Sequence, residues 1–371
     1  MKEGWEIKKL GEVCELSAGG DVPKDNFSKT KTEKYSIPIY ANGEKNEGLY
    51  GYTNIAKVSK PSITVSARGT IGFSVKRLEA FFPVVRLIVV TPINQKELDL
   101  DFLDYSLKRI DFKHSGSSIP QLTVPMIRDY EIPLPPLPEQ QRIVSILDET
   151  FSAIDKAKAN AEQNLKNAKE LFESYLQGVF ESGSWETKTL NQISENLDSK
   201  RVPITKNKRK SGDIPYYGAS GIVDYVADYL FDEDLLCVSE DGANLLARTY
   251  PIAFSISGKT WVNNHAHVLK FPNVITQKFV EAYINSIRID DYVSGMAQPK
   301  LNQKMLNKIP IPVPSLENQQ TIVRQLDALR AETQKLEAVY QKKIADLEEL
   351  KKSILQKAFA GELETETLET V

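Results

Sequence analysis

The sequence is poor in residues that cross-link a fold or anchor it in a membrane. Its two cysteines, Cys14 and Cys237, fall in different halves of the 371-residue chain, so a disulfide framework is not expected and a reducing compartment fits. No run of about 18 apolar residues is present, which excludes a membrane-spanning helix. The first residues lack the apolar stretch of a secretory signal. We therefore expect a cytoplasmic protein.

The charge is nearly balanced overall but is unevenly distributed. A net charge of −3 argues against general adhesion to nucleic acid. Between positions 200 and 210, however, six basic residues occur without an acidic one: Lys200, Arg201, Lys206, Lys208, Arg209 and Lys210. A local basic surface can attract phosphates because screened fields act over only ~8–10 Å. We predict phosphate contacts for this run, and the alternative is a solvated loop without a role.

The chain contains one pattern twice. Residues 116–180 and 295–359 align without a gap at a constant spacing of 179 (295 − 116). Recurring positions include Pro120, Leu122, Pro133, Gln140, Gln141 and Asp148, which return as Pro299, Leu301, Pro312, Gln319, Gln320 and Asp327. The pair Trp5-Glu6 also returns as Trp185-Glu186. This length of repeat exceeds the roughly 20–50 residues of a solenoid unit and indicates two whole modules.

Each module is predicted to be a β-rich globular part followed by a proline-rich segment and a helix. In the first, β-prone runs predict strands at 62–65, 70–75 and 84–90, and apolar spacing predicts a helix near 97–110. The segments 132–138 and 309–314 hold prolines too densely to join a sheet ladder, so we expect extended, stiff chain there. The expected fold is mixed α+β, divided at residues 1–135, 136–183, 184–309, 310–361 and an acidic tail 362–371.

Both helices carry an apolar stripe typical of a coiled coil. From Val144 to Val179, apolar residues recur in steps of three and four and include Tyr175, with Lys158 as an interruption. The second stripe runs from Ile322 to Ala358 and includes Leu336. Ser315 is a predicted N-cap, and Gly361 a predicted stop. Two equal helices in one chain can pair intramolecularly, and the duplication favours an antiparallel pair.

These stretches resemble the specificity subunit of Type I restriction–modification systems. The resemblance rests on three stretches in the first half and their counterparts in the second: Trp5–Val13, Gly116–Leu122 and Ile132–Val144, then Trp185, Ile311–Pro314 and Gln319–Val323. It covers the whole chain and its segment order. One departure is that Leu316-Glu317-Asn318 stands where the first half has Leu-Pro-Glu.

The resemblance implies a DNA-selecting subunit without chemistry of its own. Each module would be a target-recognition domain that reads one half of a split DNA sequence. The paired helices would set the spacer and dock two methyltransferase subunits, and restriction and translocase subunits would join them. The chain itself would bind no metal and no cofactor, because S-adenosylmethionine, ATP and Mg²⁺ would bind the partner subunits. Since the modules share little sequence, the target should be asymmetric.

Candidate DNA-reading residues lie in loops that follow strands, and their side chains can pair with base edges. In the first module they are Tyr40, Asn42, Lys45, Arg68, Thr70, Ser117, Ser118 and Gln121. In the second they are Tyr217, Ser220, Asn244, Lys259, Asn263, Asn264 and Lys300. The alternative for each is a residue that only caps a turn.

Motifs for catalysis are weak. Ser257-Gly258-Lys259-Thr260 imitates the end of a phosphate-binding loop, but Ala253 stands where the first glycine should be. His265 and His267 would share one face of a strand and could bind zinc, although no cysteine or third histidine is near. Glu6 with Lys8 could be part of a nuclease cluster but lacks a further acidic partner at a suitable spacing.

Two competing functions remain open. One is a scaffold whose two modules bind proteins, which should show no salt-dependent duplex binding. The other is a stand-alone nuclease or methyltransferase. The missing Asn/Asp-Pro-Pro-aromatic motif of adenine methyltransferases weighs against the second.

Overall fold

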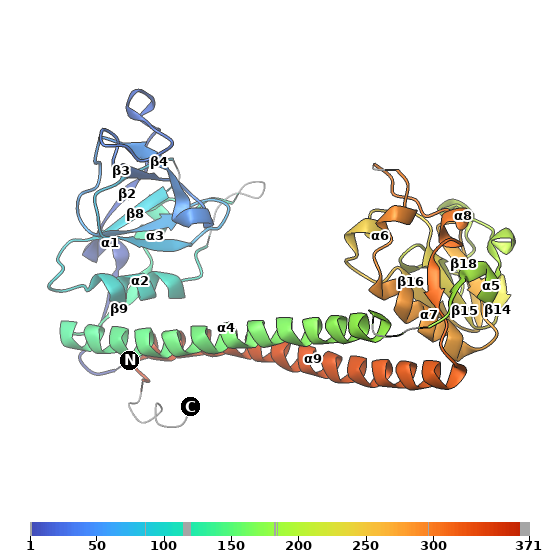
Figure 1. The fold of residues 1–371 in the computed structure, drawn as a ribbon. Coiled ribbons are helices and arrows are strands. Elements are labelled where there is room, and N and C mark those ends of the chain that lie inside the picture. The colour runs from blue at the N-terminus through green and yellow to red at the C-terminus, as the bar shows by residue number, and fades with distance from the viewer. Residues whose placement is uncertain are drawn as a thin grey trace. The chain divides into compact units, whose positions relative to one another are not determined.

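The computed structural model describes residues 2–85, 87–113, 120–181, 183, 185–295 and 297–363, and all statements about structure concern these residues. The chain divides into two compact units. One unit comprises the residues up to Ala161 together with those from Lys342 on, and the other spans Glu162–Gln341. Each unit therefore holds one β-rich module and a segment of each long helix (Figure 1).

The first module combines small sheets with three helices (Figure 1). Within the described residues, one sheet has the order β2-β8-β5-β6, a second the order β4-β3-β7, and β1 pairs with β9. The elements are β1 (Glu6–Lys9), α1 (Leu10–Val13), β2 (Cys14–Ala18), β3 (Ile37–Tyr40), β4 (Leu49–Thr53), β5 (Ser62–Ser66), β6 (Ser74–Arg77), β7 (Phe82–Pro83), β8 (Leu87–Pro92), α2 (Leu100–Arg109), α3 (Val124–Arg128) and β9 (Glu131–Leu134).

The second module repeats this topology. Its sheets have the orders β11-β18-β15-β16 and β13-β12-β17-β14, and β10 pairs with β19. The elements are β10 (Thr187–Thr189), α5 (Leu190–Ile193), β11 (Glu195–Asn196), β12 (Ile214–Gly218), β13 (Gly221–Val226), β14 (Phe231–Asp232), β15 (Leu235–Ser239), α6 (Asn244–Ala247), β16 (Ala253–Ile256), β17 (Lys259–Val262), β18 (Ala266–Lys270), α7 (Val274–Ser286), α8 (Gln303–Leu306) and β19 (Pro310–Pro312). Even the parallel pair recurs, as β3 with β7 and β12 with β17.

Two sequence predictions about strands were wrong. Residues 67–73 belong to no strand, and the strand predicted from position 70 begins only at Ser74. The proline-rich segments do join sheets, because β9 pairs with β1 and β19 pairs with β10. Pro133 lies opposite Ile7, and Pro312 lies opposite Thr187. Each sheet has only two strands, so a proline that lacks an N–H can face the open edge without losing a ladder bond.

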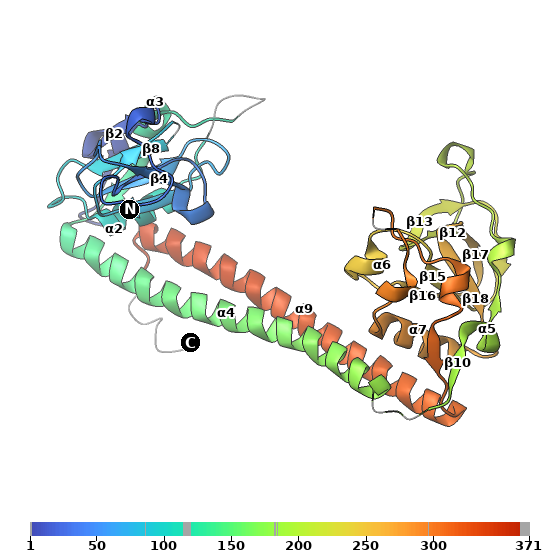
Figure 2. The same cartoon turned by 45° about the horizontal axis from the view of Figure 1, so that its top comes forward.

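Two 45-residue helices, α4 (Leu137–Glu181) and α9 (Leu316–Ala360), follow the modules. In the first unit they run antiparallel, since Asp155 binds Lys351 at 2.8 Å and Lys158 binds Glu348. In the second unit the Tyr175 hydroxyl donates to Gln325 at 3.0 Å. Figure 2 shows the two helices side by side within each unit. The fold is thus mixed α+β with an antiparallel intramolecular helical pair.

The helix ends follow the predicted chemistry. The backbone N–H of Asn318 donates to the Ser315 hydroxyl at 3.3 Å, which confirms the N-cap of α9. The helix ends at Ala360, and Gly361 adopts a positive φ of 79°, as its predicted role as a stop requires.

The seam departs from prediction at Tyr175 and Leu336, which are 37% and 41% exposed. No helix of the described residues is long and apolar enough to cross a bilayer.

Candidate nucleic-acid interface

In the first module, three connections meet at one edge of the sheets. The Asn42 side chain, after β3, accepts a hydrogen bond from the backbone N–H of Ala67, after β5, at 3.0 Å. The carbonyl of Ala67 accepts from the N–H of Leu122, just before α3, at 2.9 Å. Beside this contact, Arg68 donates to the Gln121 side chain through Nε at 3.0 Å and Nη2 at 2.6 Å. Residues far apart in sequence thus form one surface.

The second module builds the same edge from equivalent residues. The N–H of Leu301 donates to the Glu240 carbonyl at 2.8 Å, which repeats the bond between Leu122 and Ala67. Ser239 donates its hydroxyl to the carbonyl of Ala219 at 2.5 Å, and the N–H of Asn263 donates to the Tyr217 carbonyl at 3.0 Å. The backbone of this surface is therefore duplicated, although most of its side chains differ.

The structure gathers most of the first-module candidates at this edge. Lys45 and Thr70 are exposed, and Asn42 and Arg68 are half-buried through the contacts above. Tyr40 is also half-buried, with the Arg77 guanidinium 3.5 Å from its ring centroid. Ser117 and Ser118 lie outside the described residues. These positions stay predictions for DNA contact.

In the second module, the candidates separate into two groups. Ser220, Asn264 and Lys300 are exposed, and Tyr217 is half-buried. The other three have internal roles or lie elsewhere. Asn244 is buried and binds the N–H of Thr249 and the carbonyl of Tyr250, and the buried Asn263 accepts from the N–H of His265. Lys259 lies over the Tyr229 ring at the far end of β17. Asn244 and Asn263 thus serve the fold of their own module, and Lys259 lies apart from this edge.

The basic run from 200 to 210 divides in the same way. Lys200, Lys206, Lys208 and Lys210 are exposed. Arg201 points inward to Glu240 at 2.8 Å, with only 12% of its side chain exposed. Arg209 pairs with Asp224 at 2.8 Å and lies over the Tyr216 ring. The two arginines therefore hold their own module together, and the four lysines remain the predicted phosphate contacts.

Beneath the second-module edge lies a largely buried charge cluster formed by Asp198, Arg201, Glu240 and His267, which the exposed Lys300 joins. His267 contacts Asp198 through Nδ1 at 2.6 Å, and its Nε2 donates to the Leu301 carbonyl at 2.7 Å. Lys300 reaches Glu240 at 3.2 Å. Burial opposes charge on both acids, yet hydrogen bonds and positive neighbours hold the pKa of Asp198 and of Glu240 below the ordinary values. The cluster anchors Lys300 and the segment before α8.

This cluster changes the interpretation of the histidines. Asp198, Glu240 and His267 bring three potential ligand atoms within 4.8 Å of one another, but Arg201 already supplies the positive charge between the two acids. His265 is exposed and contacts Asp241 instead, so the two imidazoles do not share a site. Sequence reasoning missed Asp198 and Glu240 because 42 residues separate them (240 − 198) and no local pattern links them.

The weak catalytic motifs have structural explanations. Ser257 and Gly258 connect β16 to β17, and Gly258 has a positive φ of 69° that suits a tight turn. Glu6 and Lys8 pair with each other at 2.8 Å on the exposed face of β1.

Comparison with known proteins places this architecture in a family. The model for the Type I restriction modification DNA specificity domain matches the chain twice, at residues 2–166 and 183–347. The chain therefore belongs to this family, and the repeat unit is the family's domain.

Similar curated proteins carry related descriptions. A putative type I restriction enzyme specificity subunit of Haemophilus influenzae is 35% identical over 43% of this chain and 41% of its own length. A putative type I specificity subunit of Mycoplasma pneumoniae is 43% identical over 41% of this chain and 44% of its own length. The chain thus matches less than half the length of these two relatives. The EcoDI specificity subunit of Escherichia coli is 24% identical over 97% of this chain and 88% of its own length.

Solved structures show the same fold. A chain described under complex assembly and conformational transition of the type I R-M system matches with a TM-score of 0.78 and 18% identity, covering 98% of this chain and 99% of that one. The HsdS subunit from Thermoanaerobacter tengcongensis matches with a TM-score of 0.60 and 19% identity, covering 98% of each chain.

Proposed function

We propose that this chain is the DNA-specificity subunit of a Type I restriction–modification complex, with each module reading one half of a bipartite, asymmetric target. The observation that carries the proposal is the duplicated edge with different side chains. Arg68 and Gln121 form the first-module edge, and Asp241 and Lys300 stand at the equivalent positions of the second. Arginine and lysine both suit guanine, but glutamine pairs with adenine whereas aspartate accepts from cytosine. One backbone pattern could thus read two sequences.

In this proposal the chain performs no chemistry. The helices α4 and α9 set the distance between half-sites and dock two methyltransferase subunits, which restriction and translocase subunits join. S-adenosylmethionine, ATP and Mg²⁺ belong to those partners, and this chain binds none of them. The exposed lysines between 200 and 210 neutralise DNA phosphates without sequence preference.

The deciding experiment is a single-molecule methylome of cells that carry this gene with its methyltransferase, compared with cells that lack this gene alone. We expect adenine methylation at one split, asymmetric motif to disappear with the gene. If the methyltransferase is expressed and no motif changes, the proposal fails.

Duplex binding separates this function from a protein-binding scaffold. The methyltransferase complex that contains this chain should bind duplex DNA with an affinity that falls steeply as salt rises. A complex that assembles normally and yet shows no salt-dependent DNA affinity would favour the scaffold.

A further inference from the structure

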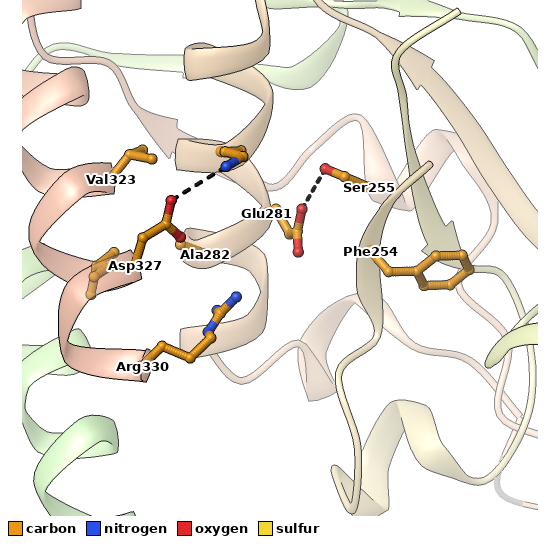
Figure 3. A pocket seen from close by; sticks show the side chains of 9 residues that line it. Phe254, Ser255, Glu281, Ala282, Val323, Asp327 and Arg330 are labelled. Atoms are coloured by element: carbon orange, nitrogen blue, oxygen red, sulfur yellow. Dashed lines mark hydrogen bonds and ion pairs between the residues drawn. The ribbon is translucent and has the colours of Figure 1, made fainter. Parts of the chain in front are cut away.

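The second unit has a pocket of about 240 Å³ that the DNA-reading role leaves unused. It lies between α7, α9 and strand β16 (Figure 3). Phe254, Ala282, Val323 and Leu326 form its apolar part. Charged groups border it: Lys278 pairs with Asp327 at 3.3 Å, Glu281 accepts from the Ser255 hydroxyl, and Arg330 extends from α9.

The first unit supplies an internal reference for this pocket. The Gln140 side chain accepts from the N–H of Asp99 at 2.9 Å, and the equivalent Gln319 accepts from the Thr276 hydroxyl at 2.8 Å. The helices α2 and α7 therefore correspond at a spacing of 177 (276 − 99). The same spacing relates Phe102 to Phe279, and both of these rings are buried.

At this spacing, Tyr105 of the first unit corresponds to Ala282 of the second (105 + 177). The Tyr105 ring packs edge-on against Phe151 with centroids 5.6 Å apart. Its hydroxyl donates to Asp148 at 2.5 Å. At the spacing of 179 that relates the two long helices, Asp148 and Phe151 correspond to Asp327 and Arg330, two residues that line the pocket. The pocket thus occupies the place that a tyrosine side chain fills in the other unit.

From this correspondence we infer that the pocket binds a phenol ring, the side chain of a tyrosine presented by the methyltransferase subunit. The inference about the partner rests on the proposed function. The carboxylate of Asp327 accepts the phenol hydroxyl, as Asp148 does for Tyr105. Ala282 and Leu326 contact the ring. The Arg330 guanidinium replaces the Phe151 ring. It lies 5.5 Å from the centroid of the Phe172 ring and also borders the pocket, where it offers a cation to the π face of the phenol.

One consequence is that the two docking positions for methyltransferase differ. The first unit fills this place with its own Tyr105, whereas the second requires a residue from outside. A partner tyrosine therefore adds affinity at the second unit alone.

The chemistry of the pocket can be tested with p-cresol, which is the tyrosine side chain as a free molecule. Ligand-observed NMR on the full chain should show saturable binding at one site. Ala282→Tyr should weaken that binding at least tenfold, because the introduced ring fills the pocket. Ala227→Tyr, at an exposed position of the same module outside the pocket, should leave it unchanged. Tyr105→Ala should add a second p-cresol site. Absence of saturable binding to the natural chain, or equal binding by Ala282→Tyr, overturns the inference.

The partner is tested by the affinity of purified methyltransferase subunit for the same chains. Ala282→Tyr should weaken one of two binding events at least fivefold, with Ala227→Tyr as the matched control. Equal affinity for the natural chain and Ala282→Tyr overturns the assigned partner. A methyltransferase that binds neither chain overturns the proposed function, and the p-cresol titration still decides whether the pocket takes a phenol.

Discussion

Gln140 and Gln319 show how single buried residues tie each helix to a module. Beyond its bond to Asp99, Gln140 donates from Nε2 to the carbonyls of Glu97 and Pro135 at 2.7 and 2.8 Å. Gln319 makes the matching bond to Pro314 at 2.8 Å. Each amide therefore serves polar groups that burial would otherwise leave unsatisfied.

We predict that Gln140→Ala lowers the free energy of unfolding of the first unit by about 1–3 kcal/mol, because the N–H of Asp99 and two carbonyls are left without their partner. Urea denaturation monitored by circular dichroism measures the change. Gln177→Ala on the exposed face of α4 is the control and should stay within about 0.5 kcal/mol. Equal effects of the two substitutions would contradict the assigned role of Gln140.

The charge cluster predicts a pH dependence for the second unit. The folded-state pKa of Asp198 and of Glu240 lies below the ordinary values of 3.8 and 4.5. Their stabilisation is therefore complete above those values and is lost as pH falls through them toward the lower folded pKa. Asp198→Asn should cost about 3 kcal/mol near neutral pH, since it leaves His267 and Arg201 with a weaker acceptor.

Urea midpoints between pH 7 and pH 3 check this prediction. The natural chain should lose stability steeply below about pH 4.5, and Asp198→Asn should give a flatter profile over the same range. Asp213→Asn, an exposed carboxylate of the same module, is the control. Profiles of urea midpoint against pH that run parallel for all three chains would show that the cluster does not cause the loss of stability at low pH.

Residue type alone predicted the candidate site only in part. Asn42, Arg68 and Gln121 gather at one edge, as loop residues after strands were expected to do. Asn244 was chosen on the same grounds and Arg201 as part of the basic run, yet both serve their own module. The decisive partner of Arg201 is Glu240, which lies 39 residues away in sequence. Such a partner becomes visible only when strands are aligned in space.

At the scale of elements, periodicity predicted both helices closely but not every seam position. The prediction assigned Tyr175 to the seam, whereas the neighbouring Leu176 is buried. An α-helix turns every 3.6 residues, so a face counted in steps of 3.5 drifts by about 20° per heptad. Over a helix of 45 residues this drift moves the buried face to an adjacent residue.

The short helical turn Lys206–Lys208 and its flanks form the predicted phosphate-binding segment. We predict that neutralising Lys206, Lys208 and Lys210 together, each to Gln, weakens duplex binding for all sequences. The slope of log affinity against log salt should become shallower by about 1 for each DNA phosphate that the variant no longer neutralises. Titrations of labelled duplex at several salt concentrations provide the measurement.

The matched control removes three lysines from the exposed face of α4: Lys156, Lys166 and Lys169. It changes net charge equally but should leave the salt slope near that of the natural chain. The phosphate role is refuted if the two triple variants shift the slope by the same amount.

At the scale of the whole molecule, the duplication predicts that the modules act separately on DNA sequence. Substituting both Arg68 and Gln121 by Ala should relax or change the half-site of the first module only. Each good bidentate base contact contributes about 1–3 kcal/mol of discrimination, so methylation at the natural motif should fall at least several-fold. A methylome of cells that carry the variant should show an unchanged second half-site. Simultaneous change in both half-sites would contradict separate reading.

The repeat in the sequence was sufficient to predict two modules and two helices, because residues 116–180 recur at one spacing as residues 295–359. It was not sufficient to predict the composition of each compact unit. Phe359, near the end of α9, packs against Phe102 of the first module with centroids 4.9 Å apart. Phe180 of α4 packs against Phe279 of the second module in the same way, at 5.4 Å. The first unit is therefore built from both ends of the chain.

That arrangement has a consequence for protein synthesis. Between Ala161 and Lys342 the ribosome must add 181 residues (342 − 161), which takes about 10–35 s at roughly 5–20 residues per second. During this interval the apolar surface around Phe102 is not yet covered by the segment that carries Phe359. A chain that stops at residue 341 should therefore be degraded faster than the full chain in a pulse–chase experiment, and equal lifetimes would refute this. The last helix thus completes the first unit only after the second module has been synthesised.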